Sequence, residues 1–391
     1  MLVTENQLKF QRKLAVPALL AFSASFFLPF FHIRENRVAS EVPVRITECG
    51  LVPAVLLLIP PLLILLYACN RSKRQSEIML MLAGSLGILL PLMILGYAGS
   101  AAIQGLGPFS RYSSDSGLYV YILAVMIIYF MKPKLITLDY LAVMLVLSAV
   151  LIAGYYGIFN RLGILLEARN FGSRLNREII AHIRITSISL GISIIIGLPA
   201  SFISYQSSTL RKLVFPLLNI LQTIPAIALF GLLIAPLAML SMNFPQLRAM
   251  GIRGIGNAPA IIALSMYAVY PIVRYSFTAF SSIDSSVILA AQGVGMSSSQ
   301  VWGIVRFPLA APSILHGIRV AFVQTIGNAT LAKLIGGDGL GVLVFEGLGQ
   351  ASADMVLLGM LLIVALTLVV DRLFQIVIFL LTPVSLRQKD N

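Results

Sequence analysis

Residues 51–69 read LVPAVLLLIPPLLILLYAC, a run without one charged or amide side chain. A helix rises about 1.5 Å per residue, so about 20 such residues cross the hydrocarbon of a bilayer. The run is apolar on every side, whereas the strands of a membrane β-barrel alternate apolar and polar residues. The stretch therefore predicts a transmembrane helix.

The rest of the chain repeats this pattern. Of its 391 residues, 58% are hydrophobic and 11% are charged, whereas an average soluble domain is about 25% charged. This much apolar surface indicates that lipid is the second solvent of the chain. Runs that fit a helical span occur at residues 14–31, 51–69, 78–97, 117–131, 135–159, 183–205, 213–238, 259–278, 310–335 and 355–380. They predict an all-α integral membrane protein of about ten transmembrane helices.

The basic residues indicate how these spans are oriented. If all the runs cross the membrane, the following short clusters fall on one side of it: Lys9, Arg12, Lys13, Arg71, Lys73, Arg74, Lys132, Lys134, Arg211, Lys212, Arg387 and Lys389. The positive-inside rule makes that side cytoplasmic. We therefore expect a multi-pass protein of the bacterial inner membrane with both termini in the cytoplasm. The longer opposite loops hold acids together with Arg34, Arg37, Arg45, Arg169, Arg174 and Arg177.

The net charge of +13 is also explained by the membrane. Most of the lysines and arginines lie between apolar runs, where they set topology and contact lipid headgroups. We therefore expect membrane lipids and no nucleic acid among the partners.

Residues 160–182 form the long polar stretch of the chain. Five spans with little polar content precede it, and five spans interrupted by polar residues, glycine and proline follow it. This change predicts an N-terminal membrane extension of five spans at residues 1–160 and a second domain at residues 161–391.

The sequence lacks the signatures of an enzyme. It has no Gly-x-x-x-x-Gly-Lys-Ser/Thr loop, so we do not expect it to bind and hydrolyse ATP itself. His32, His182 and His316 stand apart from other ligand types and are expected to be interfacial or loop side chains. Residues 336–341, GGDGLG, lack the flanking strand of a nucleotide loop and predict a tight extracytoplasmic turn. We expect no catalytic residue, no metal and no cofactor in this chain.

The most informative segment is the predicted cytoplasmic loop before residue 310. Asp284 can cap a short helix at residues 285–292, and Gly293 and Gly295 then permit a sharp exit. Residues 297–299 can cap a second helical stretch, and Pro308 is expected to turn the chain into the next span. Exposed apolar residues in such a loop indicate a partner surface. An amphipathic helix lying on the bilayer is the alternative, and physical reasoning alone does not separate the two.

The spacing of this loop is similar to the Glu-Ala-Ala loop of ABC-importer permeases, in which a glycine and then an apolar residue and Pro follow at fixed intervals. The matching residues are Leu289, Ala290, Ala291, Gly295, Val305, Phe307 and Pro308. In that family the loop forms a coupling helix that sits in a groove of the ATPase subunit. Leu289 departs from the pattern, because the family usually has glutamate there.

Further stretches narrow the resemblance. Residues 219–225, 259–274 and 334–341 resemble permeases of the glycine betaine and choline osmoprotectant group, except for Asp338 in the last turn. This likeness covers residues 180–382, and the long N-terminal half resembles the YehY type within the group. The resemblance implies a MetI-like type I permease core formed by the last five spans.

Polar residues also lie inside two of these spans. Asn219, Gln222 and Thr223 share one helix face, as do Gln324, Thr325 and Asn328. Pro225 removes a backbone hydrogen bond from the middle of the predicted span 213–238. Such faces meet either a translocation pathway or a neighbouring helix, and both interpretations stand. Tyr267 and Tyr270 could face a quaternary ammonium, but we expect both to be packing residues.

The resemblance implies a non-enzymatic permease that moves glycine betaine or a similar osmoprotectant. Its expected partners are two ABC ATPase subunits that use ATP, a second copy or a sister permease, and a periplasmic or lipid-anchored substrate-binding protein. Another solute, such as an amino acid or a choline-like compound, is the alternative substrate. A secondary transporter is the alternative class, but it needs intramembrane acids or inverted repeats. Asp139 and Asp371 lie near the ends of predicted spans, and no repeat is evident.

Overall fold

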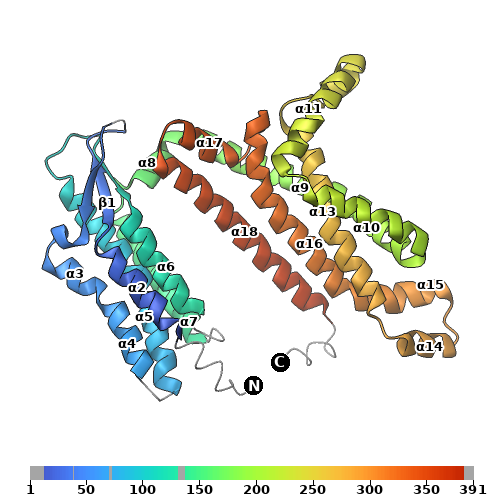
Figure 1. Cartoon of the computed structure of the whole chain (residues 1–391), viewed down its shortest axis with the longest axis horizontal. Coiled ribbons are helices and arrows are strands. Elements are labelled where there is room, and N and C mark those ends of the chain that lie inside the picture. Colours follow the sequence, from blue (N-terminus) through green and yellow to red (C-terminus); the bar gives the residue numbers. More distant parts are fainter. Residues whose placement is uncertain (1–12, 38, 70–72, 131–136, 383–391) are drawn as a thin grey trace. The chain divides into compact units, whose positions relative to one another are not determined.

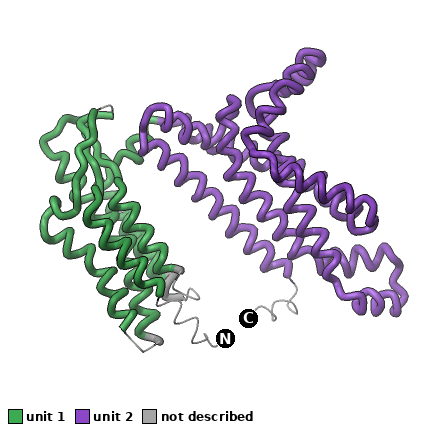
Figure 2. Tube along the Cα trace, in the orientation of Figure 1, with its two compact units in different colours: residues 1–170 green, residues 171–391 purple. Residues whose placement is uncertain are grey.

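A computed structural model describes residues 13–37, 39–69, 73–130 and 137–382 (Figure 1). Of the basic residues used for the predicted orientation, Lys9, Arg12, Arg71, Lys132, Lys134, Arg387 and Lys389 lie outside the described residues. The chain forms two compact units, Met1–Asn170 and Phe171–Asn391, which Figure 2 colours separately. The predicted domain limit at residue 160 stays a prediction.

Unit 1 combines long helices with a small sheet. Its helices are α2 (Ala15–Ser25), η1 (Ile46–Cys49), α3 (Leu51–Leu57), α4 (Ile59–Cys69), α5 (Lys73–Ala102), α6 (Ser116–Phe130), α7 (Thr137–Tyr155) and α8 (Gly163–Phe171). Its strands are β1 (Pro29–Arg34), β2 (Val42–Arg45) and β3 (Arg111–Ser114), in the antiparallel order β2-β1-β3. The predicted span at residues 14–31 is therefore too long, because its last residues belong to β1.

Three predicted extracytoplasmic segments meet at this sheet. β1 and β2 come from the first segment and β3 from the second, and the backbone N–H of Tyr112 in β3 donates to the carbonyl of Arg161 in the third at 3.2 Å. The alternation of the spans requires these segments to lie at one end of the helices, and the structure places them together. Which side of the membrane this end faces stays a prediction.

Unit 2 consists of helices in its described part. These are α9 (Ser173–Gln206), α10 (Ser208–Thr223), α11 (Ala226–Asn243), α12 (Pro245–Ala249), α13 (Asn257–Ser281), α14 (Ser285–Gly293), α15 (Ser298–Gln300), η2 (Val301–Arg306), α16 (Phe307–Ala329), η3 (Thr330–Ile335), α17 (Gly341–Gly349) and α18 (Ala353–Leu381). α13 packs on α9 and α16, while α18 packs on α16 and α17. Apolar side chains such as Leu190, Ile272 and Ile314 fill the centre of this bundle.

The structure confirms the predicted class of helical membrane protein. Among the described residues, seven helices are long and apolar enough to cross a membrane: Leu51–Cys69, Gln75–Ala102, Ser173–Gln206, Ala226–Asn243, Asn257–Ser281, Ser298–Ile335 and Ala353–Leu381. Three shorter apolar helices, Ala15–Ser25, Ser116–Tyr129 and Leu141–Tyr155, coincide with the remaining predicted runs.

The predicted span at residues 213–238 is two helices. α10 ends at Thr223, Ile224 is extended with ψ 125°, and Pro225 precedes the first residue of α11. A residue before proline avoids the α region because the proline ring clashes with it. Pro225 therefore separates two helices instead of kinking one.

Candidate functional site

The helix α14 begins where the sequence predicts. The Asp284 carboxylate accepts a hydrogen bond from the backbone N–H of Ser286 at 2.8 Å, so it satisfies one of the first free donors of the helix. The predicted cap is confirmed, and the helix extends one residue beyond the predicted range, to Gly293.

This cap gives a testable pH dependence. Hydrogen bonds from Ser286 hold the pKa of the Asp284 carboxyl below its usual value. The cap is therefore complete at neutral pH and is lost as the pH falls through that lowered pKa. We expect Asp284→Ala to reduce hydrogen-exchange protection of the Ser286 and Val287 amides at pH 7. Asp284→Asn, which still caps but does not titrate, should keep that protection, and equal protection in the alanine variant would contradict the cap.

The end of α14 is a glycine turn. Gly295 has φ +86°, its N–H donates to the carbonyl of Gln292 at 2.9 Å, and the N–H of Met296 donates to that of Ala291 at 3.2 Å. These two bonds form a Schellman motif, which places its glycine in the left-handed region. Ser297 then forms a reciprocal capping box with Gln300, as predicted for the second helical stretch.

Pro308 does not turn the chain, which corrects the prediction. The segment Ser298–Ile335 is one continuous helical run that contains Pro308 near its start. The π-helical turn η2 precedes this proline. A π-helical turn changes the backbone pairing locally, so a residue without an N–H fits there without ending the helix.

The surface of α14 is apolar and open. Val287 is 40% exposed, Leu289 65% and the following Val294 77%, and Ala290 is also exposed. Ala291 is buried, so it attaches the helix to its own unit. Apolar residues grouped on a short connection indicate a surface for another molecule. Small Ala290 beside Leu289 permits close approach of a partner.

An aromatic cluster joins this connection to the membrane helices. The Trp302 ring in η2 lies 4.8 Å from the Phe202 ring of α9 and 5.5 Å from the Phe280 ring of α13, centroid to centroid. The Arg306 guanidinium lies 4.9 Å from the Trp302 ring centre and 5.3 Å from that of Tyr205, and it donates to the Tyr205 hydroxyl. Through these rings η2, which follows α14 in the chain, packs against both α9 and α13.

Sequence reasoning missed these residues. Trp302 is the only tryptophan of the chain and stands four residues before Arg306, a helical spacing that places the two side chains on one face. Of the predicted loop residues, Val305 is half-buried, and the exposed Phe307 ring lies 6.4 Å from that of Phe280.

The predicted polar face of α10 meets α13 at one residue. The Gln222 side-chain amide donates to the Tyr267 carbonyl at 2.8 Å, and the Tyr267 hydroxyl donates to the carbonyl of Ile224 in the helix break. Buried Tyr267 therefore satisfies a backbone group that the break at Pro225 leaves open. Half-buried Tyr270 packs against the cluster around Val273.

The remaining predicted pathway residues stay separate from this contact. Asn219 and Thr223 are exposed, and the Thr223 hydroxyl donates to Ile220 within its own helix. On α16, Thr325 is buried and donates to Ala321, whereas Gln324 and Asn328 are half-buried. A pathway-lining role of either face stays a prediction.

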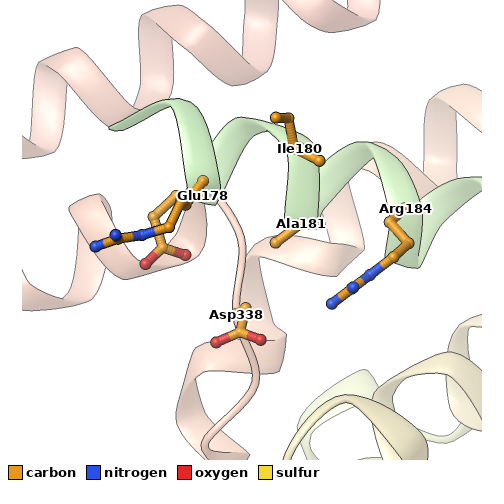
Figure 3. A pocket seen from close by; sticks show the side chains of 6 residues that line it. Glu178, Ile180, Ala181, Arg184 and Asp338 are labelled. Carbon is orange, nitrogen blue, oxygen red and sulfur yellow. The ribbon is translucent and has the colours of Figure 1, made fainter. Parts of the chain in front are cut away.

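The glycine turn at residues 336–341 is fixed to two helices. The N–H of Gly339 donates to the Glu178 carboxylate of α9 at 2.9 Å, and the Asp338 carboxylate accepts from the Asn257 amide of α13 at 2.8 Å. Asp338 and residues of α9 line a cavity of about 360 Å³. Figure 3 shows Asp338 facing Glu178, Ala181 and Arg184 of α9. The turn is confirmed, whereas its extracytoplasmic location stays a prediction. Asp338, the residue that departs from the family pattern, has Asn257 as its partner.

His182 corrects a further expectation. It is fully buried in α9, accepts from the N–H of Leu340 at 3.2 Å and donates to the carbonyl of Ile326 at 3.1 Å. This pattern needs the neutral ring protonated on Nε2. The side chain therefore holds the turn against two helices and is not interfacial.

The apolar spans, the broken helix pair and the capped connection together define a polytopic helical membrane protein. Residues 190–381 match the family described as binding-protein-dependent transport system inner membrane component. Residues 11–165 match the N-terminal domain of the ABC transporter permease YehY. The chain belongs to this family of inner-membrane permeases of ABC importers.

Two relatives and one solved structure illustrate the similarity. The osmoprotectant import permease protein OsmW of Salmonella typhimurium is 34% identical over 206 residues, 53% of this chain and 91% of that protein. The glycine betaine/carnitine/choline transport system permease protein OpuCB of Bacillus subtilis is 31% identical over 206 residues, 53% of this chain and 88% of that protein. A chain of the MetNI methionine ABC transporter aligns with TM-score 0.47 at 21% identity, over 55% of this chain and 99% of that one.

Proposed function

We propose that this permease imports a small zwitterionic or cationic osmoprotectant, with glycine betaine as the first candidate and a choline-like compound or an amino acid as the alternative. Relatives named for osmoprotectant and glycine betaine/choline import support this class of solute. The cavity of Figure 3 also supports it, because Arg184 and Asp338 offer charges of both signs to a zwitterion.

The surface of α14 carries the proposal for coupling. Permease subunits of ABC importers work with ATPase and substrate-binding components. Here α14, with Leu289 65% exposed, is the helix that enters the groove of an ATPase subunit on the cytoplasmic side. The permease pairs with a second copy or a sister permease, and a binding protein delivers the solute from outside.

The proposed cycle follows from the packing of the connection. ATP closes the two ATPase subunits, α14 moves with them, and the contact of Trp302 and Arg306 with α9 and α13 transmits the movement to the membrane helices. The cavity between the permeases then switches from inward- to outward-facing. This chain itself binds no nucleotide and catalyses no reaction in the cycle.

Reconstitution tests the class and the substrate separately. The purified permease is placed in liposomes with its ATPase and binding protein, and uptake of labelled glycine betaine, choline and an amino acid is measured. We expect uptake of one of these solutes only with ATP and the ATPase. Uptake driven by an ion gradient without the ATPase would overturn the coupling mechanism, whereas ATP-driven uptake of an amino acid alone would change only the solute.

A further inference from the structure

A basic pocket lies at the sheet end of unit 1. Segments next to β1, β3 and α8 enclose a cavity of about 600 Å³. Its charged lining consists of arginines contributed by three separate segments: Arg37, Arg111, Arg161 and Arg169. Among the described lining residues there is no acidic side chain, and asparagines such as Asn160 add amide donors.

One buried carboxylate compensates only part of this charge. Arg37 Nε and Arg111 Nη1 donate to the same oxygen, Glu167 Oε1, at 3.0 and 2.8 Å. Glu167 is 1% exposed, so this buried carboxylate holds the two guanidinium groups in place. The pocket is left strongly positive, because the other two arginines have neutral partners.

These neutral partners are oxygens of the chain. Arg161 Nη1 donates to the carbonyl of Pro108 at 2.5 Å, and Arg169 Nη2 donates to the Asn160 side-chain oxygen at 2.9 Å. Such contacts hold the guanidinium planes in place but leave their charge uncompensated. Fixed guanidinium groups are pre-organised for an oxyanion, because little side-chain entropy remains to be lost on binding.

Arg111 gives an independent indication of a missing partner. Its side chain is 9% exposed, and its Nε is buried without a hydrogen-bond partner among the described residues. The bond to Glu167 is therefore single rather than bidentate, and a donor remains for a third group. Glu167 Oε2 is likewise buried without a hydrogen-bond partner in the part of the chain that the structure describes, so this pair is not fully satisfied by its own partners, which is unusual for buried polar groups.

We propose that this pocket binds an oxyanion of the phosphate class. Guanidinium groups match the oxygens of phosphate in paired, charge-assisted hydrogen bonds, and several of them around one cavity suit a group with more than one charge. The source is either a free phosphate ion or the phosphate of an anionic lipid headgroup. Phe109 at the pocket is 76% exposed, so its apolar ring can contact acyl chains beside a bound headgroup. This site lies in unit 1, whereas residues 190–381, which match the transport-system family, lie in unit 2. The proposal therefore does not depend on the proposed transport function.

The test compares two exposed arginines in the full-length protein. Arg169→Gln removes a pocket charge from an exposed side chain that donates hydrogen bonds to Asn160, so folding should be preserved. Arg248→Gln removes the same charge from exposed α12 in the other unit and serves as the control. Thermal unfolding in detergent is measured against inorganic phosphate at constant ionic strength. Native mass spectrometry measures retention of phosphatidylglycerol against phosphatidylcholine.

The two measurements distinguish a free phosphate ion from a lipid headgroup. If phosphate raises the unfolding midpoint of the wild type and the control, and the apparent Kd of Arg169→Gln is about tenfold weaker, the ligand is a free oxyanion. If phosphatidylglycerol is retained by the wild type and the control but lost from Arg169→Gln, the ligand is a lipid headgroup. Equal behaviour of Arg169→Gln and Arg248→Gln in both arms overturns the proposal.

Discussion

Replacing Gly295 with valine is expected to reduce ATP-driven uptake more than tenfold while the protein still inserts into the membrane. Gly295 has φ +86° at the end of α14, and no atom lies within 4 Å of an added Cβ. The effect is therefore conformational and not steric. The left-handed conformation costs a residue with a Cβ about 1–2 kcal/mol, and it costs a β-branched residue such as valine more. The Schellman turn would open, and α14 would no longer present Leu289 and Ala290 in a fixed position.

A neighbouring glycine provides the matched control. Gly293 also has open space around an added Cβ, but it is the last residue of α14 and has no positive φ. Gly293→Ala should therefore transport normally. Uptake of glycine betaine by proteoliposomes and co-purification of the ATPase subunit are the two measurements. Normal uptake by Gly295→Val would remove α14 from the coupling mechanism, and the assignment of the chain to its family would not be affected.

The parts of this site that sequence predicts follow local rules. Asp284, Gly295 and Ser297 act through backbone groups within a few residues, so their residue types and spacing suffice to predict the capped helix and its exit. The apolar runs are local in the same sense, because a bilayer selects for length and composition. For this reason the predicted apolar runs coincide with the apolar helices of the structure.

The features that sequence missed depend on distant partners. The residues of β1 were included in an apolar run because Phe30 and Phe31 are apolar in a helix and in a strand alike. Their pairing with β2 and β3 makes the segment a strand. The contacts of Trp302 and Arg306 with α9 could not be predicted, because their partners Phe202 and Tyr205 lie about a hundred residues earlier in the chain. The buried position of His182 depends in the same way on the turn near Leu340.

Proline was the least reliable local signal. Pro225 separates two helices, whereas Pro199, Pro271 and Pro312 lie inside continuous helices. In a membrane a backbone carbonyl at a helix break must find a partner, and the Tyr267 hydroxyl supplies one to the carbonyl of Ile224. Whether proline ends a helix therefore depends on the neighbouring helix, which the sequence does not reveal.

Asp371→Ala is expected to destabilise unit 2 strongly. Asp371 of α18 accepts from Arg319 Nε of α16 at 2.5 Å and from the Gln375 amide at 2.8 Å. Both charged residues lie within candidate membrane spans, and both side chains are 23% exposed. The two charges therefore pair between different helices. Removing the carboxylate leaves the Arg319 charge alone between apolar helices, at a cost of about 2–3 kcal/mol.

Thermal unfolding of the detergent-solubilised protein measures this cost, with Arg372→Ala as the control. Arg372 is adjacent but exposed, and its Nη1 donates to the side-chain oxygen of Gln375 in its own helix, so its loss should leave the unfolding midpoint unchanged. The double variant Arg319→Leu with Asp371→Leu should recover most of the stability, because no unpaired charge remains in the apolar surroundings. A midpoint of Asp371→Ala equal to that of the wild type would show that Arg319 reaches water or lipid headgroups without its partner. The pair would then contribute nothing to holding α16 against α18, and the contact between these two helices would depend on apolar packing such as Phe322 against Phe374.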